Sequence, residues 1–261
     1  MTFSPKLVAL DIDGTLVDAA GRMPDEVFRA VRRVVDSGVP AVLSTGRSWI
    51  GTQPIFEQLQ LPPGWAVSSN GAIVVTNPPF ELRYETLFDP SESIELVSRL
   101  IPQARIAVER GLKRYASAPF PNGELQGHVE IVSLDELGAE PVSRLIIREP
   151  GTEDGRVFDA LIGELGLHEV TYFVGWSAWL DIAPKGVDKA SGLQIVCDDL
   201  GIDRADVLAL GDGNNDIEML EWAGRGVAIG DAPSAVKDAA DHVTGTFAEL
   251  GTVVELDRWF T

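Results

Sequence analysis

The segment KLVALDIDGTL at residues 6–16 decides the fold, because an apolar run ends abruptly at a polar turn. An uninterrupted apolar run of this length is typical of a strand buried on both faces of a parallel sheet, so we expect a strand over 6–10. Asp11 and Asp13 follow directly, and Gly14 allows the chain to turn so that both carboxylates reach one site. An Asp-Gly turn at a strand end explains this segment equally well when it is taken alone.

The same alternation of apolar runs and helix-period segments continues along much of the chain. Helices are predicted over 24–37 and 187–200, and strands over 39–44, 206–210 and 226–230. Strands that alternate with helices in this way form parallel sheets with helices on their faces. We therefore expect an α/β fold with a Rossmann-like parallel-sheet core, in which ligands bind at the carboxyl ends of the strands.

The middle of the chain has a different pattern, in which strand-like stretches dominate. Strands are expected near 104–109, 127–132, 144–148 and 170–174, and helices at about 91–100 and 153–165. Proline and glycine mark the edges of this region at 77–79 and 183–186, as expected of hinged linkers. We predict a core formed by 1–78 and 183–261, and an inserted α/β domain, or cap, over 79–182.

The charge of the chain excludes several classes of partner. Its 261 residues include 40 acidic and 21 basic side chains, for a formal net charge of −19. Such a surface repels nucleic acid and anionic membranes, so neither is an expected partner. Any phosphate site must supply its own local positive charge. No apolar stretch reaches about 18 residues, no signal peptide is recognisable, and the single cysteine, Cys197, cannot form an internal disulfide. We expect a folded, cytoplasmic protein in which Cys197 is a core residue.

A second acidic loop, GDGNND at 211–216, also follows an apolar strand. Taken alone, it has the pattern of a helix start with Asp216 as an ordinary first-turn acid. Taken with the first loop, it places Asp11, Asp13, Asp212 and Asp216 at neighbouring strand ends, where unpaired carboxylates would repel one another. A hard cation with oxygen ligands removes that repulsion, and Mg²⁺ suits a site with few carboxylates and a substrate phosphate. The pattern therefore predicts a magnesium site.

A turn of sequence STGR at 44–47 offers groups that bind phosphate oxygens. The Thr45 hydroxyl and the Gly46 N–H lie at a strand-to-helix turn, although a Thr-Gly turn alone is a weak signal. A dianionic phosphate beside several carboxylates also needs a fixed positive charge. Lys185 and Lys189 are the candidates, and we favour Lys189 because it opens a helical segment and can point back to the sheet edge.

Taken in order, four features of the chain resemble the haloacid dehalogenase superfamily, and in particular its Cof-type branch. They are DIDGTL at 11–16, TGR at 45–47, Lys189 and GDGNND at 211–216. Two further stretches look like the same branch: SNGA at 69–72 and GVAIGDA at 226–232, although Asn is commoner in the branch at the position of Asp231. The resemblance spans nearly the whole chain.

The resemblance implies a role for each candidate residue. Asp11 would be the nucleophile, Asp13 the general acid and base, and Lys189 a charged catalytic partner. Magnesium would be held by Asp11, the backbone carbonyl of Asp13, Asp212 and Asp216, the last either directly or through an oriented water. The phosphoryl oxygens would be held by Thr45, the Gly46 backbone, Lys189 and Asn215. The inserted domain would be the large α/β cap that sets substrate specificity in this branch.

The function implied is a magnesium-dependent phosphatase that hydrolyses a small phosphomonoester, such as a sugar or polyol phosphate, through an aspartyl-phosphate intermediate. A phosphorylated cofactor is an alternative substrate. The competing functions are a phosphosugar mutase of the same superfamily and a non-catalytic module that binds a phosphorylated ligand. A dehalogenase is disfavoured because it does not need the second acid, Asp13. A small phosphorylated metabolite is the expected partner.

No motif in the inserted domain identifies the leaving group of the substrate. Lys113, Arg114 and Tyr115 form a basic and aromatic patch beside Gly111 that could meet a sugar phosphate, although such a patch is more often a solvated turn. Arg47 is a similar case, since it could approach the substrate or form a structural ion pair.

Overall fold

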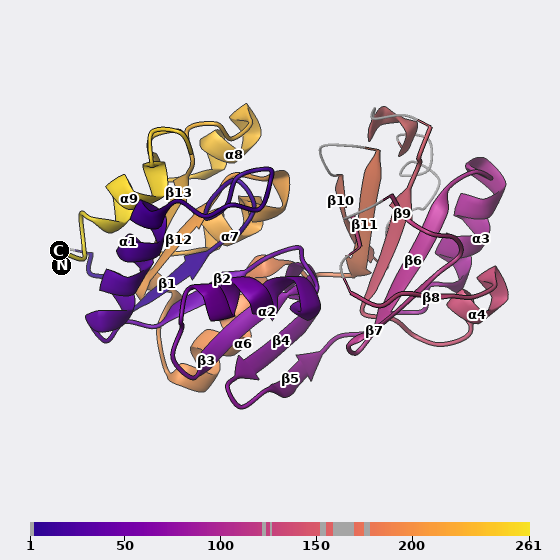
Figure 1. The fold of residues 1–261 in the computed structure, drawn as a ribbon, viewed down its shortest axis with the longest axis horizontal. Coiled ribbons are helices and arrows are strands. Elements are labelled where there is room, and N and C mark those ends of the chain that lie inside the picture. Colours follow the sequence, from indigo (N-terminus) through magenta and orange to yellow (C-terminus); the bar gives the residue numbers. More distant parts are fainter. Residues whose placement is uncertain (1–2, 122–123, 126, 152–154, 159–169, 175–177) are drawn as a thin grey trace. The chain divides into compact units, whose positions relative to one another are not determined.

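The computed structural model describes residues 3–121, 124–125, 127–151, 155–158, 170–174 and 178–261 (Figure 1). The chain forms two compact units. Unit 1 contains Met1–Tyr84 and Asp188–Thr261, and unit 2 contains Glu85–Val187. The identification of a catalytic core and a cap that sets specificity stays a prediction.

Among the described residues of unit 1, eight strands form one sheet in the order β14-β13-β12-β1-β2-β3-β4-β5. The strands are β1 (Leu7–Leu10), β2 (Ala41–Ser44), β3 (Gly64–Ser68), β4 (Ile73–Asn77), β5 (Glu81–Glu85), β12 (Val207–Gly211), β13 (Arg225–Ala228) and β14 (His242–Val243). Neighbouring strands from β14 to β3 are parallel, whereas β3 and β4 are antiparallel. The predicted α/β class with a parallel-sheet core is confirmed.

Helices cover both faces of this sheet. The α-helices in the described part of unit 1 are α1 (Asp25–Asp36), α2 (Trp49–Gln58), α6 (Lys189–Leu200), α7 (Ile217–Trp222), α8 (Ser234–Ala239) and α9 (Gly251–Leu256). The 3₁₀ helices are η1 (Ser69–Gly71), η3 (Arg204–Asp206) and η4 (Asn214–Asp216). The predicted helices 24–37 and 187–200 correspond to α1 and α6.

Two hydrophobic clusters explain the apolar run of β1. Val8 and Leu10 are buried on one face of the sheet with side chains from α1, α2 and α9. Leu7 and Ala9 are buried on the other face with side chains from α6, α7 and α8. Because successive side chains of a strand point to opposite faces, covering both faces requires an apolar residue at every position. β1 is thus a central strand, with β2 on one side and β12 on the other.

The described residues of unit 2 contain a six-stranded sheet in the order β10-β11-β9-β6-β7-β8. The strands are β6 (Arg105–Arg110), β7 (Lys113–Ala116), β8 (Glu130–Ile131), β9 (Arg144–Arg148), β10 (Val170–Val174) and β11 (Trp179–Pro184). Neighbouring strands are antiparallel, except that β7 and β8 are parallel. One face packs against α3 (Ser91–Leu100) and α4 (Leu134–Gly138) through a hydrophobic cluster.

Several predicted elements of this region differ in the structure. β7 and β11 lie where no strand is predicted, and the strand predicted over 127–132 is reduced to Glu130–Ile131. The helix predicted over 91–100 is α3. Most of the helix predicted over 153–165 lies outside the described residues, and its described part, Gly155–Phe158, is the 3₁₀ helix η2.

The segments predicted as linkers partly belong to regular structure. The segment 77–79 contains the end of β4 and the start of its connection to β5. The segment 183–186 begins inside β11, whose last residue is Pro184, and the chain turns at Gly186 with a φ of +71°. No helix found in the described ranges has the length and hydropathy of a membrane span.

Candidate active site

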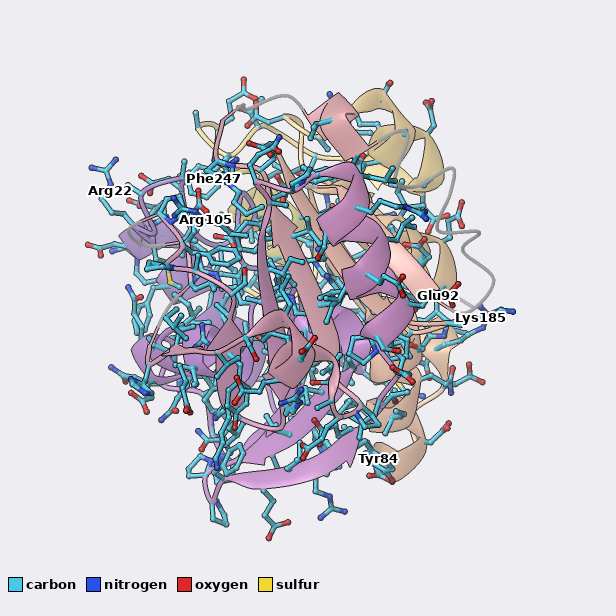
Figure 2. The ribbon with its side chains drawn as sticks, turned by 90° about the vertical axis from the view of Figure 1, so that its right-hand side faces the viewer. Arg22, Tyr84, Glu92, Arg105, Lys185 and Phe247 are labelled. Carbon is cyan, nitrogen blue, oxygen red and sulfur yellow. The ribbon has the colours of Figure 1, made fainter. Side chains whose placement is uncertain are left out.

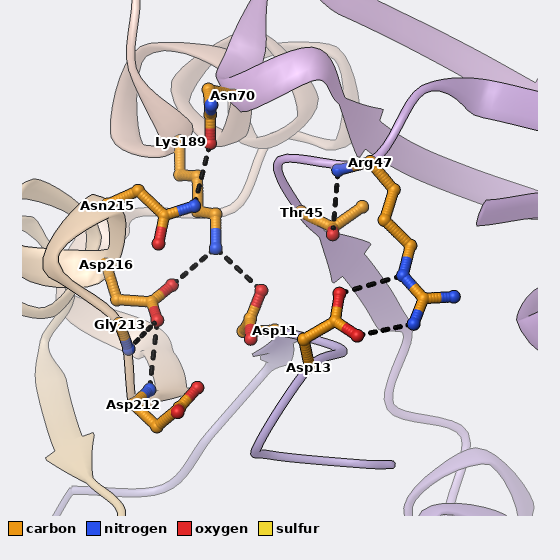
Figure 3. Close-up of polar contacts among 10 residues, drawn as sticks. All are labelled: Asp11, Asp13, Thr45, Arg47, Asn70, Lys189, Asp212, Gly213, Asn215 and Asp216. Carbon is orange, nitrogen blue, oxygen red and sulfur yellow. Dashed lines mark hydrogen bonds and ion pairs between the residues drawn. The ribbon is translucent and has the colours of Figure 1, made fainter. Parts of the chain in front are cut away.

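Three loops leave the same edge of the unit 1 sheet. β1 ends at Leu10 and is followed by Asp11, β12 is followed by Asp212, and β2 is followed by Thr45. Because β1 pairs in parallel with both β2 and β12, their carboxyl ends lie side by side. Figure 3 shows the polar side chains that gather there. The sheet topology therefore brings segments together that are about 170 to 200 residues apart in sequence.

The loops after β1 and β12 approach each other closely at Gly14, and a larger residue does not fit there. Its φ is +76°, and an added Cβ would lie only 2.2 Å from Oδ2 of Asp212. The turn after β1 is held by the N–H groups of Leu16 and Val17, which both donate to the carbonyl of Ile12. A side chain at position 14 would thus strain the backbone and displace an acidic group of the neighbouring loop.

Lys189 lies between two buried carboxylates. Its Nζ donates to Oδ1 of Asp11 and to Oδ1 of Asp216, each at 2.6 Å, and its side chain is fully buried (Figure 3). Burial opposes its charge, but the two carboxylates outweigh that effect and raise the pKa of Lys189. The ammonium is therefore charged at every physiological pH, as a fixed partner for phosphate requires.

The start of α6 places Lys189. Asp188 is the N-cap, and its side chain and that of Ser191 each accept the other's backbone N–H. Lys189 is the first residue of the helix, so its side chain points back toward the sheet edge. Lys185, the other lysine considered, is exposed and belongs to unit 2 (Figure 2). Of these two lysines, the structure brings Lys189 to Asp11.

Both oxygens of the Asp216 carboxylate accept hydrogen bonds. Besides Lys189, it accepts the N–H of Asp212 at 2.9 Å and that of Gly213 at 2.8 Å, both through Oδ2. An added Cβ at Gly211 would lie 2.4 Å from its Cγ, so the loop closes tightly around it. This arrangement makes Asp216 the residue that shapes the second acidic loop.

Three carboxylates form a group that fits a metal ion. Ligand oxygens of Asp11, Asp212 and Asp216 all lie within 4.8 Å of one another. Burial and the charge of Asp216 raise the pKa of Asp11 well above its usual range, although Lys189 opposes the shift. The same two causes raise the pKa of Asp212 to about 7. One ammonium does not balance three carboxylates, and a bound divalent cation would supply the missing positive charge.

The Asp13 carboxylate points to Arg47 instead of joining this group. Arg47 Nε donates to Oδ2 of Asp13 at 2.8 Å, and Nη2 donates to Oδ1 (Figure 3). Although burial opposes it, the paired carboxylate raises the pKa of Arg47. Of the two possibilities considered for Arg47, the structure contains the ion pair. The expected contact of Asp13 with a metal, through its backbone carbonyl, is compatible with this side-chain position.

The predicted phosphate-binding residues lie together. Thr45 is buried, with its hydroxyl accepting the N–H of Arg47 at 3.1 Å. An added Cβ at Gly46 would lie 3.2 Å from Nδ2 of Asn215, so the two loops are in close contact. Asn215 itself donates from Nδ2 to Oδ1 of Asn70 at 2.9 Å. The site thus contains a residue, Asn70, to which the sequence analysis gave no role.

Asn70 lies in η1, a turn of unusual backbone geometry. Ser69, Asn70 and Gly71 have φ values of +50°, +52° and +98°. The N–H of Ser69 donates to the carbonyl of Arg47 at 2.7 Å, and that of Asn70 to the carbonyl of Thr45 at 3.0 Å. These bonds tie η1 to the phosphate-binding turn. The Asn-Gly pair was the available signal, since both residues tolerate the left-handed region.

Comparisons relate the whole chain to known proteins. The family model for haloacid dehalogenase-like hydrolases matches residues 8–256. Among curated proteins, the chain is 30% identical to the 5-amino-6-(5-phospho-D-ribitylamino)uracil phosphatase YitU of Bacillus subtilis, over all of both chains. It is 28% identical to the phosphatase YcsE of the same organism, named for the same substrate, over 97% of this chain and 95% of YcsE.

Solved structures show the same fold. A haloacid dehalogenase-like hydrolase from Bacteroides thetaiotaomicron has a TM-score of 0.80 at 26% identity, over 98% of this chain and 100% of that one. The subclass IIB sugar phosphatase BT4131 has a TM-score of 0.83 at 23% identity, over 97% and 98% of the two chains. The predicted family and the predicted enzyme class, a phosphatase, are confirmed. The chain belongs to the haloacid dehalogenase-like hydrolase family.

Proposed function

We propose that this protein is a Mg²⁺-dependent phosphatase that hydrolyses a small phosphomonoester through an aspartyl phosphate on Asp11. The observation that carries the proposal is the contact of Lys189 with Asp11. A buried carboxylate that touches a fixed ammonium, next to two further acidic groups, combines a nucleophile with the positive charge that a phosphate needs. The names of the relatives support a phosphatase.

Asp11, Asp212 and the backbone carbonyl of Asp13 would hold the metal, with Asp216 as a direct ligand or as the acceptor for a bound water. The closeness of the three carboxylates and the raised pKa values of Asp11 and Asp212 support this choice. When bound, Mg²⁺ would offset negative charge on the carboxylates and on the phosphoryl oxygens.

The reaction would proceed in two displacements at phosphorus. An oxygen of Asp11 attacks the phosphorus, the bond to the ester oxygen breaks, and a protonated Asp13 gives its proton to the leaving alkoxide. Asp13 then takes a proton from water, whose oxygen attacks the phosphorus of the aspartyl phosphate. Orthophosphate leaves and the Asp11 carboxylate is restored. Arg47, which donates to both oxygens of Asp13, would hold this side chain in place.

The phosphoryl oxygens would be held by Lys189, the Thr45 hydroxyl, the Gly46 N–H and the amide of Asn215. These groups face negative charge that shifts between the oxygens during transfer, and fixed donors stabilise it without reorganisation. The tight approach of Gly46 to Asn215 supports a common ligand for the two loops.

The substrate would be a phosphate ester of a sugar or polyol. Two relatives are named as phosphatases of a phosphoribitylamino pyrimidine, and one structural neighbour is named as a sugar phosphatase. Unit 2 would be the cap that selects the leaving group, and unit 1 the catalytic core.

Phosphate release from a panel of phosphorylated sugars, polyols, glycerates and cofactors tests the proposal. We expect release that needs Mg²⁺, stops with EDTA and is lost in Asp11→Asn, which keeps the shape of the side chain without its nucleophilic charge. Isomerised sugar phosphates without free phosphate would instead identify a mutase. Ligand binding without either product would identify a non-catalytic module.

A further inference from the structure

The second face of the unit 2 sheet carries a row of alternating charges. Because directly opposed residues of antiparallel strands share a face, Arg114 on β7, Glu109 on β6 and Arg144 on β9 point the same way. Asp181 on β11 lies opposite Ile146, two residues along β9 from Arg144, and so joins the row. All four side chains belong to buried residues. The row therefore reads cation, anion, cation, anion across four strands.

Three members of this row, Glu109, Arg144 and Asp181, are paired with one another. Arg144 donates from Nε and Nη2 to the two oxygens of Asp181, at 2.9 and 3.0 Å, and from Nη1 to Glu109 at 3.3 Å. Burial opposes the charge of Arg144, but Asp181 and Glu109 outweigh it and raise its pKa. This paired geometry is the usual way in which a sheet tolerates buried arginine.

Arg114, at the end of the row, lacks such a partner. It is only 4% exposed, yet within the described part of the chain its buried Nε and Nη2 have no hydrogen-bond acceptor. Glu109 lies opposite on β6, but its carboxylate is engaged by Arg144. Burial, together with the charge of Arg144, lowers the pKa of Arg114, although Glu109 opposes the shift. Two buried donors of a cation that have no acceptor cost folding free energy, which an incoming anion would recover.

The two unsatisfied atoms of Arg114 identify the chemistry of the missing partner. Nε and Nη2 form one edge of the planar guanidinium, and Arg144 uses this same edge to bind both oxygens of Asp181. That edge matches two oxygens of one carboxylate or phosphate group. Lys113, the neighbouring residue, is exposed and points to the opposite face of β7, so it is not part of this arrangement.

We propose that Arg114 is the centre of an oxyanion-binding site on the charged face of the unit 2 sheet, which takes a carboxylate or phosphate through Nε and Nη2. The oxyanion completes the alternating row beyond its last cation. It is either a dissolved anion or an acidic group carried by the substrate, and the two sources share the same recognition chemistry.

Thermal unfolding of the full chain tests the site without any assay of activity. Wild type, Arg114→Met and Lys113→Met are compared in sodium chloride and, at the same ionic strength, in malonate or inorganic phosphate. Both variants remove one positive charge, but only the first removes the buried guanidinium. We expect Arg114→Met to be at least as stable as wild type in chloride, because methionine fills the space without a buried charge. We expect the anions to raise the unfolding temperature of wild type and Lys113→Met by several degrees more than that of Arg114→Met.

Enzyme kinetics distinguish a dissolved anion from an acidic group of the substrate. Only this kinetic experiment rests on the proposed phosphatase function. 3-Phosphoglycerate and glycerol 3-phosphate differ in a carboxylate that replaces a hydroxymethyl group. If the substrate carries the oxyanion, wild type and Lys113→Met prefer the glycerate in kcat/KM, and Arg114→Met loses that preference by at least about tenfold. If a dissolved anion is bound, the preference is the same in all three proteins while the thermal difference persists.

Two results would overturn the site. An equal response of all three proteins to the anions, with no change in substrate preference, would mean that anions bind elsewhere. A clear loss of stability of Arg114→Met in chloride, again without a difference in anion response, would mean that Arg114 is a structural partner of Glu109. A chain without phosphatase activity that still shows the thermal difference would refute the proposed function and leave the oxyanion site standing.

Discussion

The ammonium of Lys189 lies between Asp11 and Asp216, and its charge decides how many of the neighbouring carboxylates can ionise. In its absence, burial and mutual repulsion would favour protonation of Asp11 more strongly, which would remove the negative charge that makes the carboxylate a nucleophile. The lysine therefore has two tasks in the proposed mechanism: it favours the charged form of the nucleophile, and it faces the phosphoryl oxygens.

Replacing Lys189 by methionine removes the charge and keeps most of the side-chain volume. We expect kcat/KM for the best substrate to fall by about 10²-fold or more, because a fixed donor to the phosphoryl group is lost. We also expect the free energy of unfolding to fall by about 3 kcal/mol, because two carboxylates stay buried without their cation. Phosphate release and urea unfolding measure the two effects.

Lys185→Met provides the matched control, since it removes the same charge from an exposed position. Its unfolding free energy should differ from that of wild type by less than about 0.5 kcal/mol. If Lys189→Met kept activity within threefold of wild type, the lysine would not act in catalysis as proposed.

The 3₁₀ helix η1 combines an unfavourable backbone conformation with several contacts to the site. Its Gly71 lies so close to the N-terminus of α6 that an added Cβ would be 2.0 Å from the carbonyl oxygen of Asp188. Its N–H groups bind the carbonyls of Thr45 and Arg47, and Asn70 accepts from Asn215. A single turn thus connects the phosphate-binding turn, the helix of Lys189 and the second acidic loop. Strain of this kind persists where the surroundings hold it in place.

Substitutions at Asn70 separate the backbone of this turn from its side chain. Glycine keeps the left-handed conformation but cannot accept from Asn215, so we expect kcat/KM to fall about tenfold with little change in unfolding free energy. Alanine also lacks the acceptor, and in addition it should lose about 1 kcal/mol of unfolding free energy because of its positive φ. Aspartate retains an acceptor and should recover most of the activity. Unchanged kcat/KM in Asn70→Gly would show that the side chain does not position Asn215.

The elements of unit 1 could be predicted because their signals are local. The run of β1 is apolar at every position since both faces are covered, and the turns after β1, β2 and β12 carry their polar residues at the strand ends. Adjacency of those ends follows from parallel pairing. A structural ion pair was one of the two possibilities for Arg47, but its partner, Asp13, could not be predicted, because the pair depends on side-chain directions in two loops and not on either loop alone.

The strands of unit 2 were harder to predict, because contacts between residues that are distant in sequence outweigh the local sequence pattern. β11 contains Asp181 and ends at Pro184, both poor residues for a buried strand when considered alone. Arg144, which is 37 positions away in sequence, neutralises Asp181. β7 contains Lys113 and Arg114 and has the composition of a solvated turn, yet its arginine is buried. In both strands, the burial of a charged residue depends on the register with a neighbouring strand, and the local sequence does not show this register.

At the scale of the whole molecule, a net charge of −19 surrounds a site that itself contains several carboxylates. Divalent cations will bind such a chain without specificity, so stabilisation by Mg²⁺ alone does not identify the proposed metal site. The pH dependence of that stabilisation is more specific. The folded state raises the pKa of Asp212 to about 7 from a usual value of 3.8, and it raises that of Asp11 in the same direction.

The sign of the effect follows from linkage. A carboxyl whose pKa is higher in the folded than in the unfolded state binds its proton more tightly when folded, so its contribution to stability is complete below pH 4 and is lost as the pH rises through about 7. The metal-free protein should therefore lose stability across this window. Mg²⁺ binds the ionised carboxylates and so lowers their pKa values in the folded state. Each unit by which such a pKa is lowered corresponds to about 1.4 kcal/mol of free energy. We expect the gain in unfolding free energy from Mg²⁺ over EDTA to be larger at pH 8 than at pH 5, as measured by urea unfolding at constant ionic strength.

Asp212→Asn tests whether the gain belongs to the site, because it removes one carboxylate from the group and changes the net charge of the molecule by only one unit. Without metal at pH 8, this variant should be more stable than wild type, since an amide needs no cation in that position. Its response to Mg²⁺ should be small and should be the same at pH 5 and pH 8. An equal pH-dependent gain in both proteins would place the effect on the acidic surface as a whole, and the group formed by Asp11, Asp212 and Asp216 would then not be the metal site.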